Sequence, residues 1–222
     1  MRRFERGNDA LDAAAIVKRR QGLVVGYGHV FGAAGVLEPG MFGADGAWGW
    51  VVHRGVEYRP PRTGPLAAAV VIDTLGALRL EDDAGLQQLR SGGMLAVREA
   101  FQSYPVLLRD GALPELLLAP GGEIDLQHRD ARLALGIDAG GRLIIALTRF
   151  DALGPTLGSV PFGMTIPEIA LVMRGLGAES AVALDGGISA QLQLRDAGGE
   201  THRWPGLRPV PLGFSARVRS EE

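Results

Sequence analysis

The 222-residue sequence contains no cysteine, which excludes a thiolate nucleophile, a disulfide framework and a cysteine-ligated zinc site. It has only four histidines, and no two of them show metal-ligand spacing, so we expect no zinc site. The sequence requires no cofactor, and it leaves open whether calcium supports the loops.

Long hydrophobic runs are also missing, since none approaches the roughly 18 apolar residues of a membrane span. The first twenty residues are charged and lack an apolar segment, so we expect no signal peptide in the sequence as written. With a net charge of −2, the chain also lacks the basic surface that binding to nucleic acid requires. Location and oligomeric state are not assigned by these features.

Four common catalytic motifs are absent: GxGxxG, the phosphate-binding GxxxxGK[ST], GxSxG and HExxH. Their absence argues against nucleotide binding, hydride transfer and a serine hydrolase.

Glycine, by contrast, is abundant, with 33 residues beside 13 prolines. This is about twice the usual glycine share of roughly 7%, and it favours short strands joined by tight turns. Expected strands outnumber expected helices, and no repeat or linker interrupts the chain. We predict an α+β fold: one domain over residues 1–222, with a mixed or antiparallel sheet core and a few helices packed on it.

Some elements have clear local patterns. Residues 8–20 favour a helix. Residues 132–138 alternate between apolar and other residues, and a glycine turn joins them to residues 142–148 in a predicted hairpin. Residues 165–177 predict a second helix. In this helix, Thr165 and Glu168 form a capping box, so we do not count Glu168 as catalytic.

The stretch Asp185-Gly186-Gly187 follows an apolar strand at 181–184 and precedes an alternating strand at 189–196. One interpretation is a hairpin turn. The other is a site in which the Gly186-Gly187 amides point into one concavity and bind an anion beside the Asp185 carboxylate. Two polar residues nearest the turn, Ser189 and Gln191, are expected to line the same cleft.

Arg132 lies on a predicted strand face that otherwise carries alanine and glycine, so we expect open space above this face. The guanidinium fork would then present itself to phosphate or carboxylate, with His128 joining it from just upstream. An edge arginine paired with a surface carboxylate is the alternative. Arg149 and Asp151 form a further candidate pair, either in the site or as a surface ion pair.

Three segments together resemble the phosphodiester glycosidase domain family: QSYPVLLRDG, HRDARLALGIDAGGRLIIALT and FGMTIPEIALVMRGLGAESAVALDGGISAQL. The resemblance is strongest over residues 101–218. It places Arg132 at the family's Arg-Thr-Ala-x-Gly segment and residues 185–189 at its Leu-Asp-Gly-Gly-Gly-Ser motif. It also places Gln102 at a Gln-Ser-x-Pro segment.

The sequence departs from the family pattern at four positions: Leu133 for threonine, Ile188 for the third glycine, and Glu38-Pro39 for Asn-Gly. Family relatives are commonly exported.

The resemblance implies hydrolysis of the bond between a sugar's anomeric carbon and a phosphodiester, on a glycan or sugar phosphate of bacterial envelope type. It assigns Arg132 to a phosphate clamp, Asp185 to a base or stabilising carboxylate, and the remaining candidates to binding. The alternatives are a non-catalytic module that binds an anionic glycan and an accessory protein of exopolysaccharide production that acts through a protein partner.

Overall fold

The computed structural model describes residues 23–30, 34–37, 49–64, 67–92, 96–118, 125–150, 163–196, 198–207 and 213–217. For residues 23–30, 34–37, 149–150 and 215–217, the description covers the backbone alone. The helix predicted over residues 8–20 and the departure at Glu38-Pro39 lie outside the described residues.

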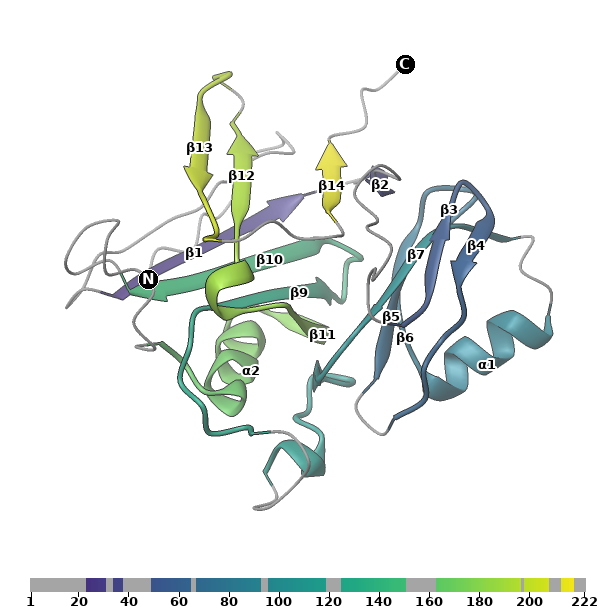
Figure 1. Cartoon of the computed structure of the whole chain (residues 1–222), viewed down its shortest axis with the longest axis horizontal. Coiled ribbons are helices and arrows are strands. Elements are labelled where there is room, and N and C mark those ends of the chain that lie inside the picture. Colours follow the sequence, from purple (N-terminus) through teal and green to yellow (C-terminus); the bar gives the residue numbers. More distant parts are fainter. Residues whose placement is uncertain are drawn as a thin grey trace.

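Two five-stranded sheets form the body of the protein (Figure 1). The first sheet has the order β1-β10-β9-β11-β8, in which the strands are Leu23–Val30, Leu143–Phe150, Arg132–Asp138, Ala178–Leu184 and Val106–Leu108. The second has the order β4-β3-β7-β5-β6, with strands Val56–Arg59, Val51–His53, Val97–Ser103, Ala68–Asp73 and Leu78–Asp82. All the strand pairs of the described residues are antiparallel.

Two smaller pairings accompany these sheets. Strand β12 (Leu192–Arg195) pairs with β13 (Thr201–Trp204), and β14 (Phe214–Arg217) pairs with β2 (Ala34–Leu37). Short 3-10 turns occur at η3 (Glu115–Leu117) and η4 (Gly187–Ser189).

The core has three layers. Between the two sheets lies a cluster to which both contribute, including Phe101 of β7, Leu135 of β9 and Val182 of β11. Helix α2 (Ile166–Gly175) buries its apolar side against the outer face of the first sheet, and α1 (Asp83–Ser91) does the same on the second. The two helices therefore flank a sandwich of sheets (Figure 1).

This arrangement confirms the predicted α+β class and the antiparallel core. Because the inter-sheet cluster is shared, the two sheets form one packed unit. The assignment of all 222 residues to one domain remains a prediction. No helix within the described ranges is long and apolar enough to cross a membrane.

The open space predicted above the Ala134–Gly136 face of β9 is wrong, because α2 covers this face. Ala134 is fully buried in the cluster beneath the helix, and a Cβ added at Gly136 would lie 2.7 Å from Met173 Cε. The small residues therefore let the helix approach the sheet closely and do not make room for a ligand.

The two elements with the clearest local patterns form as predicted. Strands β9 and β10 pair as a hairpin, and Asp138 Oδ1 accepts the amide hydrogens of Gly140 and Arg142 in its turn, both at 2.9 Å. At the start of α2, Thr165 and Glu168 form the complete capping box.

Candidate functional site

The start of β9 and the end of β11 lie side by side in the centre of the first sheet. Their antiparallel register pairs Leu133 with Leu184, which brings Arg132 and the turn after Leu184 together where the two strands end. Two motifs separated by about fifty residues in the sequence therefore meet in the fold.

The glycines of the turn fit closely against the strand segment that precedes Arg132. Gly187 N donates to Ala131 O at 2.8 Å, and a Cβ on Gly186 would lie 2.6 Å from that carbonyl oxygen. Gly187 also has a φ of +57°, in the left-handed region that side chains disfavour. Glycine is required at both positions to seat the turn here.

The prediction that Asp185-Gly186-Gly187 forms a hairpin turn is wrong. Strand β12 pairs with β13 instead of returning along β11, and the turn continues into η4. The predicted anion-binding role of the Gly187 amide is also wrong, since that amide donates to Ala131 O. The Ser189 and Ala190 amides donate to Gly186 O and Gly187 O.

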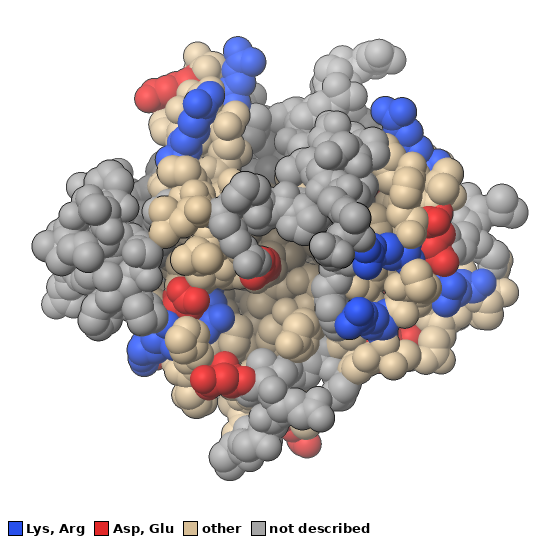
Figure 2. All heavy atoms as spheres, viewed as in Figure 1, with Lys and Arg blue, Asp and Glu red and all other residues tan. Residues whose placement is uncertain are grey.

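The polar residues of the turn divide by exposure. Asp185 and Gln191 are exposed, whereas Ser189 is only 4% exposed and belongs to the protein interior. Figure 2 shows a hollow near the middle of one face, with acidic side-chain atoms at its edge. Asp185 and Gln191 are therefore the exposed polar side chains of the turn.

Arg132 is half-buried and holds two backbone segments in place. Its Nε donates to Met164 O at 2.7 Å and its Nη2 donates to His128 O. Burial lowers the pKa of the guanidinium, while the nearby Asp130 and Asp125 carboxylates act in the opposite direction. Within the described part of the chain, the hydrogen bonds of the guanidinium come from Nε and Nη2, and Nη1 makes none.

Asp130 is a member of this site that the sequence analysis missed. Its Oδ2 lies 3.8 Å from His128 Nε2, and a Cβ added at Gly187 would lie 2.5 Å from the same oxygen. The signal was its spacing, since side chains two residues apart in an extended segment point to the same side. Asp130 stands two positions before Arg132.

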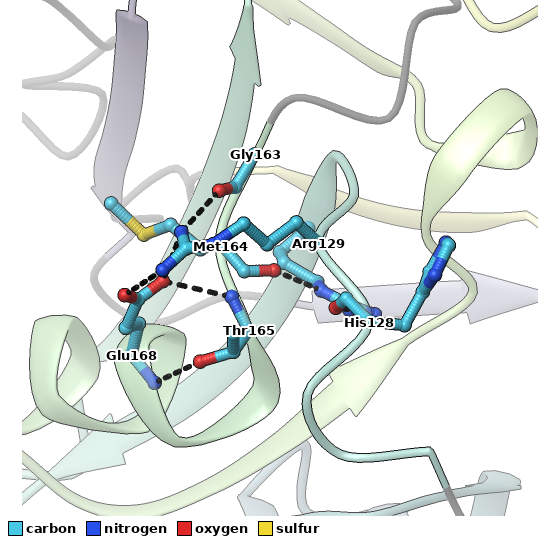
Figure 3. Close-up of polar contacts among 7 residues, drawn as sticks. His128, Arg129, Gly163, Met164, Thr165 and Glu168 are labelled. Atoms are coloured by element: carbon cyan, nitrogen blue, oxygen red, sulfur yellow. Dashed lines mark hydrogen bonds and ion pairs between the residues drawn. The ribbon is translucent and has the colours of Figure 1, made fainter.

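Arg129 and Glu168 fasten this segment to α2 (Figure 3). Arg129 Nη1 and Nη2 bind the two Glu168 oxygens at 2.9 and 2.7 Å, and Nη1 also donates to Gly163 O at 3.0 Å. Hydrogen bonding from Arg129 is the main cause of a lowered Glu168 pKa. In Figure 3, the His128 side chain points away from this cluster. His128 is therefore separate from the ion pair that anchors its neighbour.

Of the three other candidates, only Gln102 has a described side chain, and it does not join the site. Gln102 is only 4% exposed, and its amide binds the backbone of Trp50 and Arg62, so it holds these two segments together inside the protein. Arg149 lies on β10 opposite Val24, but its side chain lies outside the described residues, as does Asp151.

One group of three potential metal ligands occurs among the described residues, at the β12–β13 hairpin. Asp196, Glu200 and His202 have ligand atoms within 4.8 Å of one another. His202 Nε2 and Asp196 Oδ2 are already hydrogen-bonded at 3.0 Å, which ties together the two strands of the hairpin. Glu200 is exposed, whereas Asp196 and His202 are partly buried.

The fold and the site define the class of protein. An antiparallel sandwich carries Arg132 and the Asp-Gly-Gly turn at adjacent ends of its central strands. A sequence model of the phosphodiester glycosidase family matches residues 31–215. The chain belongs to the phosphodiester glycosidase family.

Solved structures show a similar fold. The catalytic domain of zebrafish N-acetylglucosamine-1-phosphodiester alpha-N-acetylglucosaminidase, auto-inhibited by its pro-peptide, matches with a TM-score of 0.56 and 18% identity. The match covers 85% of this chain and 64% of that one. A hypothetical protein from Synechocystis matches with a TM-score of 0.50 and 15% identity, covering 95% of this chain and 64% of that one. No curated protein matches the sequence.

Proposed function

We propose that this protein hydrolyses the bond between a sugar's anomeric carbon and a phosphodiester oxygen. The observation that carries the proposal is the meeting of Arg132 with the Asp185-Gly186-Gly187 turn at one edge of the first sheet. Family membership supports the proposed reaction class.

The chemistry suits these residues. A phosphate monoester leaves as a stabilised anion, so the reaction depends less on a strong general acid than ordinary glycoside hydrolysis does. Arg132 contributes positive charge near the leaving phosphate through its Nη1, and Asp185 contributes an exposed carboxylate. Gln191 and His128 are exposed side chains that hydrogen-bond sugar hydroxyls.

A non-catalytic module that binds an anionic glycan is the second candidate. The family pattern has threonine where this chain has Leu133. The loss of that hydroxyl next to Arg132 in the sequence favours the second candidate.

The test is release of free sugar from a panel of sugar-1-phosphodiesters by wild type, Asp185→Asn and Arg132→Ala. We expect each variant to lose 100-fold or more in kcat/KM, the scale of losing a general base or a charge-stabilising donor. Arg195→Ala and Glu200→Ala serve as matched controls on the exposed β12–β13 hairpin, with rates close to wild type.

Circular dichroism checks the fold of each variant, because Arg132→Ala also leaves the Met164 and His128 carbonyls without their donor. Asp185→Asn changes an exposed side chain and is the cleaner variant. If wild type releases no sugar but a phosphodiester raises its melting temperature, the protein is a binding module.

A further inference from the structure

Asp130 is held in place by its backbone and by one oxygen of its carboxylate. Its amide and carbonyl both hydrogen-bond the backbone of Met164, at 3.3 and 3.1 Å. Its Oδ1 accepts the Ala131 amide hydrogen at 2.8 Å. The second oxygen, Oδ2, therefore has a defined position, and the side chain remains 30% exposed.

Oδ2 faces the glycine turn and an imidazole. A Cβ on Gly187 would lie 2.5 Å from it, so only glycine lets the carboxylate approach this closely. His128 Nε2 lies 3.8 Å away on a side chain that is 54% exposed. The turn thus has two carboxylates beside it: Asp185, which precedes Gly186 in the chain, and Asp130, which packs against Gly187.

We propose that Asp130 is a catalytic residue, the base that takes a proton from the attacking water; this inference rests on the proposed function. The water oxygen bonds to the anomeric carbon as the carbon–oxygen bond to the phosphodiester breaks. The bonding electron pair leaves with the phosphate monoester, and the water proton moves to Asp130 Oδ2. His128, close to this oxygen and exposed, then carries the proton to solvent.

Placement distinguishes Asp130 from Asp185 as the base. A base must hold one lone pair in a fixed direction. In Asp130, the hydrogen bond from the Ala131 amide anchors Oδ1, and Oδ2 lies against Gly187 in the turn. Asp185 then has the other carboxylate role, electrostatic stabilisation of the oxocarbenium-like carbon. Arg132 lies close enough to Asp130 for their charges to interact, which puts the base and the phosphate clamp in one site.

The test compares Asp130→Asn with wild type on the sugar-1-phosphodiester that wild type cleaves. Asparagine retains an oxygen that can accept the Ala131 amide and loses only the basic oxygen. We expect kcat to fall by 100-fold or more while KM changes by less than about threefold, as for loss of general base catalysis. Added formate, a small substitute base, is expected to restore turnover to Asp130→Ala but not to Arg132→Ala.

Asp125→Asn is the matched control. The Asp125 carboxylate accepts the amides of Gln127 and His128, at 3.2 and 3.0 Å, so it shares the segment, the charge and the capping role of Asp130. It is expected to keep kcat within about threefold of wild type. Should Asp130→Asn fail to fold, formate rescue of Asp130→Ser tests the same step.

The outcomes separate the two proposals. An active wild type whose kcat survives Asp130→Asn overturns the role of Asp130 and leaves the hydrolase standing. Loss of kcat that formate does not restore in Asp130→Ala or Asp130→Ser also overturns it, because the carboxylate is then structural. An inactive wild type overturns both the hydrolase and the base.

Discussion

At the scale of single residues, Gly187 combines a left-handed backbone with a carboxylate packed against its α-carbon. Its φ is +57°, and Asp130 Oδ2 occupies the space that a Cβ would need. The residue therefore constrains both the turn and the position of the proposed base.

Gly187→Ala is expected to destabilise the protein more than Gly111→Ala. Gly111 has a similar φ of +73° but has nothing within 4 Å of an added Cβ, so its substitution measures the backbone cost alone, about 1–2 kcal/mol. The clash with Asp130 should add about 1–3 kcal/mol at Gly187. Denaturant unfolding measures both. Equal losses would contradict the close contact, and Asp130→Ala should remove the excess.

At the scale of elements, α2 links the core to the candidate site. Its buried residues pack on the first sheet, and its first turn binds Arg129 through Glu168. Movement of the helix relative to the sheet would therefore displace the segment that carries Asp130 and Arg132.

Glu168→Gln is expected to lower the melting temperature near neutral pH by a few degrees. The lowered pKa of Glu168, caused mainly by Arg129, means that the carboxylate stabilises the fold above its ordinary value of 4.5. This contribution is lost as pH falls through the folded-state pKa, so the difference between variant and wild type should shrink on acidification. Because the side chain is 41% exposed, solvent screening limits the effect to about 0.5–1 kcal/mol.

Melting curves between pH 7 and pH 3 test this dependence. Glu179→Gln, on an exposed side chain of β11, should show no such change. A difference that stays constant with pH would assign the effect of Glu168 to helix capping alone.

The elements also show which parts of the fold the sequence predicts. The β9–β10 hairpin and the start of α2 are determined by residues close together in the sequence, so local patterns were sufficient to predict them. The partner of β12 is β13, which no local pattern around Asp185 indicates. The face of β9 was misread for the same reason, because the helix that covers it comes about thirty residues later in the chain.

The candidate site was predicted in part. Arg132 and the Asp185 turn were identified because their residue types suggest anion chemistry, and the fold brings them together. Asp130 was missed because its importance depends on contact with Gly187, a long-range packing feature. Gln102 was included by motif, but its burial and its bonds to Trp50 and Arg62 appear only in three dimensions.

At the scale of the whole molecule, the two sheets share one buried layer. Leu135 of β9 is fully buried within it, among residues of both sheets such as Phe101 of β7 and Val182 of β11. The sheets should therefore unfold together.

Leu135→Ala is expected to cost about 2–5 kcal/mol, the range for truncating a buried leucine. Tryptophan fluorescence and far-UV circular dichroism should give the same shifted midpoint, because loss of the shared layer affects both sheets. Leu118→Ala is the control, since Leu118 is 65% exposed and its truncation should change stability little. Separate transitions by the two probes would contradict a single cooperative unit.

The hydrogen bonds inside the Asp-Gly-Gly turn also bear on how such a protein diversifies. The amides of Gly187, Ser189 and Ala190 all donate hydrogen bonds to backbone carbonyl groups of the protein. Exposed side chains next to these amides, such as Asp185 and Gln191, are then the groups that face solvent, and substitution can change them without disturbing the strand pairing beneath them. A turn with the same backbone can acquire a new ligand by substitution of a few exposed side chains, provided that Gly186 and Gly187 are retained.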